Sequence, residues 1–226
     1  MKKKFAVIGL GQFGTAIAKT LSTRNAEVIA IDKDIERVEY IKDFVSYTVC
    51  VDATNKEALI GQSIQDMDCV IVAIGEDFHS AILCGNILIE LGIKRIIGRA
   101  MGENEKLILE KLGITEIISP EDELGFRMTE SILNPNIIFS MPLPDNYLIV
   151  ELKAPHKICD EKLGEIKLRE DFGLNLITIL RATNTNNIIS HHISGVPSAD
   201  TIISPDDILV LFGKSQDITK FIDINS

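Results

Sequence analysis

Three glycines near the start of the chain have the types and spacing to hold a phosphate. Gly9, Gly11 and Gly14 follow an apolar run and precede an amphipathic stretch that begins at Gln12. The first glycine permits a tight turn, the second lets the backbone approach a phosphate, and the third lets a helix pack against a strand. The phosphate would lie at the helix N-terminus, where N–H groups and the helix dipole favour negative charge. The spacing predicts a nucleotide-binding loop.

An acidic residue stands where a ribose would bind. Asp32 ends the apolar run 28–31, further along the chain from the glycines. A carboxylate at that strand end can accept hydrogen bonds from both ribose hydroxyls and would repel a 2′-phosphate. Together with the glycine loop it predicts a nucleotide site; the alternative is a glycine turn followed by an incidental aspartate.

The elements that would position these residues alternate along the first half of the chain. Apolar runs predict strands over 5–8, 28–31, 47–51, 69–73, 95–98 and 116–118. Amphipathic stretches predict helices over 12–22, 34–43, 56–61, 78–91 and 104–112. Repeated strand–helix units imply a mostly parallel sheet with right-handed crossovers. We therefore expect an α/β fold with a doubly wound, Rossmann-like sheet.

Ligands of such sheets bind outside the carboxyl ends of the strands, so the residues that follow each strand are candidates. After the second to fifth strands these are Asp32, Lys33 and Asp34; Asp52, Ala53 and Thr54; Ile74, Gly75 and Glu76; and Arg99, Ala100 and Met101. Asp52 could accept from an adenine amino group or cap the next helix. Gly75 suggests close approach of the backbone to the ligand. Arg99, interpreted as the one cation at this edge, suits a phosphate, a carboxylate ligand or a neighbouring acid.

The pattern changes after residue 134. The helix expected over 121–133 is apolar on several faces, which predicts packing on another subunit. Three prolines predict a linker or crossover over 135–145, between a nucleotide-binding domain at 1–134 and a small α+β domain at 146–226. In the second domain we expect strands over 148–152, 174–181, 188–189 and 208–212, and helices over 158–168 and 215–224.

Composition excludes several classes of function. The net charge of −10 argues against nucleic acid as a general partner, since phosphate binding needs a basic surface. No run reaches the roughly 18 apolar residues of a membrane span, so we expect a cytoplasmic protein. The four cysteines contain no CxxC pair, and the adjacent His191 and His192 would face opposite sides of a strand, a poor arrangement for a metal.

The order of these motifs resembles the RCK (regulator of K⁺ conductance) family. This family comprises cytosolic subunits that gate bacterial Ktr- and Trk-type potassium uptake systems. The resemblance rests on residues 7–14, 28–32, 52–54, 70–75, 99–100 and 112–121, and on 147–212, which resemble the family's C-terminal TrkA-C domain. It therefore covers nearly the whole chain.

The resemblance implies a Rossmann lobe that forms homodimers and assembles into an octameric ring beneath a membrane potassium channel. The protein would then associate peripherally with the inner membrane through that channel. ATP or ADP, or NAD(H) in the Trk branch, would change the ring's shape and gate the channel, without enzymatic activity. The implied nucleotide contacts are Gly9, Gly11, Gln12, Phe13, Gly14, Asp32, Lys33, Asp34, Asp52, Ala53, Ile74, Gly75, Glu76, Arg99, Ala100, Met101 and Glu105.

Three further expectations depend on the same resemblance. Glu121 matches a family acid near the dimer axis that helps to bind a divalent cation, Mg²⁺ or Ca²⁺, although a plain helix-start acid explains it equally well. Gln12 stands where many Ktr-type members have an arginine that meets the γ-phosphate, and it brings no charge. Cyclic di-AMP binds the C-terminal lobe of some relatives, and Leu163, Arg169 and Pro197 are the candidates here.

The alternative function is an NAD-dependent oxidoreductase. Such an enzyme must place a general acid or base against the nicotinamide. His79 is the candidate for that role, yet it stands at a helix start where a capping or exposed position is expected. A redox-sensing transcriptional repressor would need a helix-turn-helix and a basic face, and the sequence indicates neither.

Overall fold

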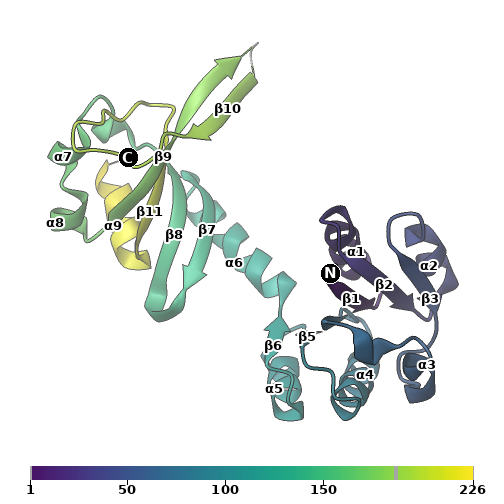
Figure 1. Cartoon of the computed structure of the whole chain (residues 1–226). Coiled ribbons are helices and arrows are strands. Elements are labelled where there is room, and N and C mark those ends of the chain that lie inside the picture. Colours follow the sequence, from purple (N-terminus) through teal and green to yellow (C-terminus); the bar gives the residue numbers. More distant parts are fainter. Residues whose placement is uncertain (1, 186–187, 226) are drawn as a thin grey trace. The chain divides into compact units, whose positions relative to one another are not determined.

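The computed structural model describes residues 2–185 and 188–225 (Figure 1). They divide into two compact units, Met1–Glu123 and Leu124–Ser226, and each is built on its own sheet. Among the described residues, no helix combines the length and apolar character needed to cross a membrane.

The first unit has a parallel sheet with strands in the order β3-β2-β1-β4-β5-β6. Its strands are β1 (Lys4–Ile8), β2 (Glu27–Asp32), β3 (Tyr47–Cys50), β4 (Cys69–Val72), β5 (Ile96–Arg99) and β6 (Glu116–Ile118). Its helices are α1 (Gln12–Thr23), α2 (Ile35–Ile41), α3 (Lys56–Ile60), η1 (Ile64–Asp66), α4 (Phe78–Glu90) and α5 (Glu103–Leu112). The predicted doubly wound Rossmann order is confirmed.

The central strands β1 and β4 are covered on both faces. Along β1, Ala6 and Ile8 belong to one buried cluster while Val7 belongs to the other. This alternation follows from the two-residue period of a strand, and it explains why the run is apolar without interruption. The chain reverses its winding direction between β1 and β4, so their carboxyl ends border the crevice where such sheets bind ligands.

Side-chain caps fix the start of three helices at that edge. Asp34 caps α2 by accepting from the Glu36 N–H, Asn55 caps α3, and Asp77 caps α4 by accepting from the Ser80 N–H. By contrast, α1 begins at Gly11, which has no side chain to fill this role. The first N–H groups of α1 are therefore available to a ligand.

The second unit has an antiparallel sheet with strands in the order β10-β9-β11-β8-β7. Helix α6 (Pro120–Leu133) leads into it and continues past the division between the units. The other elements are β7 (Ile137–Leu143), η2 (Pro144–Asn146), β8 (Tyr147–Lys153), η3 (His156–Ile158), α7 (Leu163–Ile166), α8 (Leu168–Phe172), β9 (Asn175–Thr185), β10 (Ile188–Ile193), β11 (Ile208–Lys214) and α9 (Ser215–Asn225).

Two expectations for this half are wrong. Most of the predicted linker, 135–145, is strand β7, where Pro142 is aligned with Leu148 of β8. β7 is an edge strand, and an edge strand tolerates a proline that cannot donate to the ladder. The helix expected over 158–168 is replaced by η3, α7 and α8, and Lys167 between α7 and α8 has a φ of 49°, which interrupts a helix.

Candidate nucleotide site

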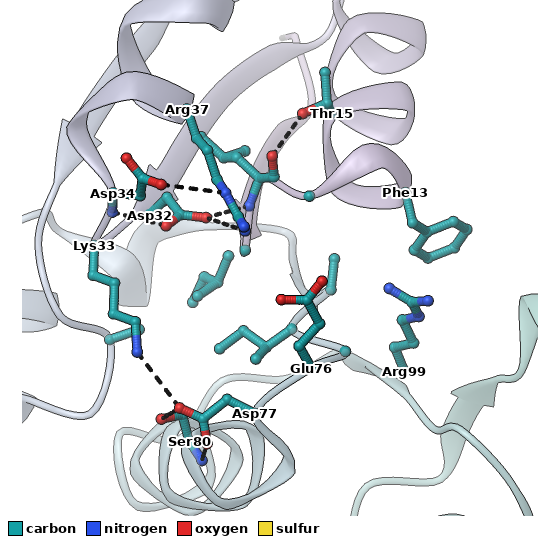
Figure 2. A pocket seen from close by; sticks show the side chains of 18 of the residues that line it. Phe13, Thr15, Asp32, Lys33, Asp34, Arg37, Glu76, Asp77, Ser80 and Arg99 are labelled. Atoms are coloured by element: carbon teal, nitrogen blue, oxygen red, sulfur yellow. Dashed lines mark hydrogen bonds and ion pairs between the residues drawn. The ribbon is translucent and has the colours of Figure 1, made fainter.

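The carboxyl ends of the parallel strands surround a pocket of about 1360 Å³ (Figure 2). Its wall comes from the ends of β1, β2 and β5, from the loops that follow β1 to β5, from helices α1, α2 and α4, and from the first turn of α6. All of this wall belongs to the first unit. Figure 2 places Asp32 and Arg99 at opposite ends of the pocket, with Glu76 between them.

The glycine loop forms one wall, and each glycine has a different reason to lack a side chain. Gly9 has a φ of +93°, and a Cβ there would lie 2.8 Å from the Ile74 nitrogen. A Cβ on Gly14 would overlap the carbonyl oxygen of Gly9. A Cβ on Gly11 would have only Arg37 Nη1 nearby, at 4.0 Å, because this glycine faces the pocket. An open glycine at an uncapped helix start fits a phosphate group.

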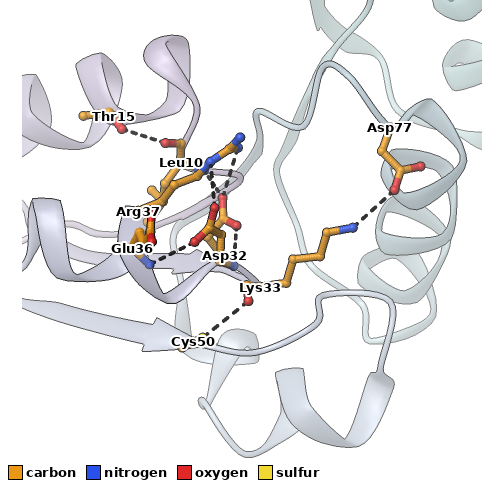
Figure 3. A network of polar contacts seen from close by, with 9 residues as sticks. Leu10, Thr15, Asp32, Lys33, Glu36, Arg37, Cys50 and Asp77 are labelled. Carbon is orange, nitrogen blue, oxygen red and sulfur yellow. Dashed lines mark hydrogen bonds and ion pairs between the residues drawn. The ribbon is translucent and has the colours of Figure 1, made fainter.

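Asp32 fastens this loop to the end of β2 (Figure 3). Its side chain is only 8% exposed. Its Oδ2 accepts from the Leu10 N–H at 2.6 Å, and its Oδ1 accepts from the Asp34 N–H at 2.9 Å. Each carboxylate oxygen has a second lone pair, so the group can still accept from ribose hydroxyls. The backbone therefore orients this carboxylate before a nucleotide binds.

Arg37 is a pocket residue that the sequence interpretation missed. It projects from α2 with Nη1 3.9 Å from Asp32 Oδ2 and Nε 3.5 Å from Asp34 Oδ2. Lys33 also lines the pocket, with Nζ 3.5 Å from Asp77 Oδ2. The interpretation of Arg99 as the one cation at this edge is therefore wrong. A signal did exist, because Arg37 follows Asp34 by three residues, the spacing of neighbours on a helix.

Arg99 occupies the other end of the pocket from the end of β5. Its guanidinium lies 5.3 Å from the centre of the Phe13 ring and forms an ion pair with Glu121. It also lies against Gly75, where an added Cβ would be 2.6 Å from Arg99 Nη1. Gly75 thus makes room for Arg99, in addition to the expected approach of a ligand. Within the described part of the chain, the buried Arg99 Nε has no hydrogen-bond partner.

Two aspartates are held by neighbouring hydroxyl residues. Asp52 Oδ1 accepts from the Thr54 N–H and Oγ1, and these bonds hold the pKa of the Asp52 carboxyl below its ordinary value. Asp77 accepts from Ser80 Oγ and N–H, which likewise lowers the pKa of the Asp77 carboxyl. Both side chains remain acceptors at neutral pH. Asp52 does not cap the next helix, because Asn55 does.

The pocket brings most of the predicted site residues together. Those on its wall are Gly9, Gly11, Gln12, Phe13, Asp32, Lys33, Asp34, Asp52, Ala53, Ile74, Gly75, Glu76, Arg99, Met101 and Glu121. Thr54, also expected after the third strand, lies on the wall as well. Residues on the wall that were not predicted include Thr15, Ala16, Glu36, Arg37, Tyr40, Asp77 and Ser80.

Three predicted residues lie behind the wall. Gly14 supports the loop, as its contact with Gly9 indicates, and Ala100 is fully buried. Glu105 Oε2 accepts from the Met101 N–H at 2.7 Å, so it fixes the start of α5. These residues shape the site through their neighbours.

Other candidates are placed as follows. Glu121 pairs with Arg99, and no group of three or more His, Cys, Asp or Glu side chains gathers for a metal among the residues that the structure describes. His79 is exposed and is absent from the pocket wall. Arg169 donates to Asn175 Oδ1 from Nε and Nη2, while Leu163 lies on α7 and Pro197 follows β10.

Family models match both halves of the chain. The model of the TrkA-N domain matches residues 5–120, and the model of the TrkA-C domain matches residues 147–225. The chain belongs to the TrkA-N/TrkA-C family. The resemblance to RCK proteins is thereby confirmed, and it extends over both units of the chain.

Relatives of similar length carry potassium-uptake names. The chain is 34% identical to Ktr system potassium uptake protein C of Bacillus subtilis, over 98% of this chain and 96% of that protein. It is 33% identical to Ktr system potassium uptake protein A of the same organism, over 97% of this chain and 95% of that protein.

Solved structures show the same fold. The RCK domain of GsuK covers all of this TrkA-type chain with a TM-score of 0.66 at 14% identity, and the GsuK channel bound to NAD has a TM-score of 0.65 at 14% identity. The chain spans 48% of the length of the first and 39% of the second. At this identity the likeness concerns the fold alone.

Proposed function

We propose that this chain is a nucleotide-binding regulatory subunit of a membrane potassium transporter. The observation that carries the proposal is the pocket with Asp32 and the open Gly11, in a chain similar over nearly its whole length to Ktr potassium uptake proteins. Ligand binding there would favour one conformation of the assembly through differential contacts, and the transporter would respond to that conformation.

The residues of the pocket suit the parts of an adenine nucleotide. Asp32 would accept from the ribose, and Asp52 and Ala53 border the space for the base. The phosphates would lie over Gly11 at the start of α1, where Arg99 lies beside Phe13 of the first turn. The protein groups would thus orient the bound nucleotide, and its phosphates would add negative charge to the pocket.

ATP or ADP is the favoured ligand, and NAD(H) is the second candidate. A volume of about 1360 Å³ accommodates either. Gln12 brings no charge to the glycine loop, and the cations Lys33, Arg37 and Arg99 share the wall with seven carboxylates. Attraction for the phosphates is therefore local, at the N-terminus of α1 and at Arg99.

The assembly belongs to the same proposal. We expect a homodimer, an octameric ring, and peripheral attachment at the cytoplasmic side of the inner membrane through a channel subunit. The support on the chain itself is α6, where no residue is buried and Leu124, Phe126, Met128, Ile132 and Leu133 are exposed. The Glu121 cation site and the cyclic di-AMP site at Leu163, Arg169 and Pro197 stay predictions.

The oxidoreductase alternative loses its acid–base candidate, because His79 does not line the pocket. Measurable turnover of NADH with carbonyl substrates would revive this alternative. The pocket contains carboxylates and guanidinium groups, which suit binding, together with Lys33, which is paired to Asp77.

Calorimetric titration of the full chain with ATP, ADP, NAD⁺ and NADH tests the proposal. We expect tight binding of ATP or ADP. Gly11→Val should abolish it while leaving the melting temperature unchanged, because its side chain would enter open pocket space. Preference for NADH would assign the site to the second candidate. Absence of binding by all four nucleotides would overturn the proposal.

A further inference from the structure

The position of the Arg99 side chain is set by other side chains. Only 15% of it is exposed, with the Phe13 ring on one side and the bare backbone of Gly75 on another. Its Nη2 donates to Glu121 Oε1. The guanidinium is therefore held at the pocket wall without any fixed bond to the backbone of the sheet.

The hydrogen bonding of Arg99 is incomplete. A guanidinium has five N–H donors in a planar fork, which matches two oxygens of one phosphate. Here the described residues provide an acceptor for Nη2 alone, and the buried Nε has none. An unpaired buried donor is costly, so an acceptor that reaches Nε would be favoured. A phosphate oxygen is such an acceptor.

Glu121 connects this guanidinium to α6. It lies in the first turn of the helix, and half of its side chain is exposed. Among the described residues, the pair with Arg99 is the one side-chain hydrogen bond or ion pair that α6 makes. The later turns of the helix belong to the second unit. The pair therefore joins the pocket wall to the segment that connects the two units.

A phosphate and Glu121 are competitors for Arg99. A terminal phosphate carries more charge than a carboxylate and can accept from two donors of the fork. Its arrival would also bring negative charge close to the Glu121 carboxylate, which repels it. Because half of the Glu121 side chain is exposed, its pairing with Arg99 contributes little free energy to oppose this exchange.

We propose that the Arg99–Glu121 ion pair is a switch that the phosphates of the bound nucleotide open, releasing the first turn of α6. This inference rests on the proposed nucleotide site and names how that site is coupled to the rest of the chain. Adenosine, which lacks phosphates, occupies the Asp32 end and leaves the pair intact. ATP and ADP reach Arg99 and break it.

The test compares Glu121→Gln with Glu123→Gln in the full chain, in the presence of EDTA. Both substitutions remove one acid from the first turn of α6, but Glu123 is exposed and lies outside the pocket wall. Calorimetry with ATP, ADP and adenosine gives affinities. Hydrogen exchange, read by mass spectrometry on peptides that span 119–133, reports the opening of α6.

In the wild type and in Glu123→Gln, ATP should accelerate exchange at the start of α6, whereas adenosine should not. In Glu121→Gln, exchange should already be fast without ligand, and ATP should add no further acceleration. ATP should bind Glu121→Gln about two- to fivefold more tightly than Glu123→Gln, because the half-exposed Glu121 carboxylate no longer competes for Arg99. Adenosine affinity should be equal in the two variants.

Two outcomes would overturn the switch while leaving the nucleotide site in place. One is ATP binding with equal affinity and equal exchange in both variants. The other is weaker ATP binding by Glu121→Gln, which would assign Glu121 to ligand binding. If ATP fails to bind the wild type, the proposed function itself is wrong, so the two failures are distinguishable.

Discussion

The pocket has a charged group at each end, and the two groups are held in different ways. Asp32 accepts from two backbone N–H groups and lies almost entirely buried, so it cannot move without moving β2 and the glycine loop. Arg99 is held by the Phe13 ring and the Glu121 carboxylate, which are side chains. Under the proposed function, the Asp32 end would recognise the ligand and the Arg99 end would respond to it.

Gly14→Ala should have the largest effect, because it disrupts the glycine loop that Asp32 holds. The new Cβ would overlap the Gly9 carbonyl oxygen, a backbone atom that cannot yield without moving the loop. We expect the free energy of unfolding to fall by about 1–3 kcal/mol, as in overpacked cores, and all nucleotide binding to be lost. Urea unfolding and calorimetry measure the two effects.

Gly125→Ala is the matched control for that substitution. Gly125 lies on α6, and a Cβ there meets no atom within 4 Å. Its stability should stay within about 1 kcal/mol of the wild type, on the stabilising side, because alanine favours a helix. Equal stability of the two variants would show that the backbone at Gly14 yields.

Asp32→Asn should weaken the binding of ATP and of adenosine to the same extent. An amide offers one acceptor oxygen, so the Leu10 or Asp34 N–H would lose its partner and the ribose would lose a charged acceptor. We expect affinity to fall about 10- to 100-fold for both ligands. Asp43→Asn, on the exposed surface, controls for charge. A loss confined to ATP would contradict the assignment of the ribose to this end.

Gly75→Ala should weaken the binding of ATP and leave that of adenosine unchanged. The added Cβ would meet the end of the Arg99 side chain, which can shift. Stability should change by less than about 1 kcal/mol, while ATP affinity falls about fivefold and adenosine affinity stays unchanged. Gly61→Ala is the control, since a Cβ there would lie 3.5 Å from its nearest neighbours. Equal losses for ATP and adenosine would contradict the division between the two ends.

Asp77→Asn should have the smallest effect, which is present at neutral pH and disappears in acid. Ser80 lowers the pKa of Asp77 in the folded chain, so the carboxylate stabilises the fold above its unfolded pKa. That contribution is lost as pH falls through about 4 towards the folded pKa. The urea midpoints of variant and wild type should therefore converge between about pH 5 and 3. A difference that is independent of pH would contradict this role.

The Asp32 end of the pocket could be predicted from sequence because the residues that form it are close together in the chain. The spacing of Gly9, Gly11 and Gly14 and the position of Asp32 at a strand end depend on one βαβ unit. Arg37 was missed because an arginine in an exposed helix pattern has no distinctive spacing beyond its distance from Asp34.

The other end depends on contacts between distant segments. Arg99 meets Phe13 of α1, Gly75 of the loop after β4 and Glu121 of α6, and no spacing in the sequence reports such contacts. The prolines around β7 favoured a linker because sequence does not reveal which strand will be at a sheet edge. Element types in the first unit were predictable because short apolar runs alternate with amphipathic stretches.

The strand order also has a consequence for how the site forms during synthesis. The Lys4 N–H donates to Asp68, 64 residues later, and β1 pairs with β4 before β5 can be added at the far side of β4. A growing chain that ends after β3 would have the glycine loop and Asp32 but no opposite wall. Contacts so distant in sequence form slowly. Nascent chains would therefore acquire nucleotide affinity late, after Arg99 has left the ribosome.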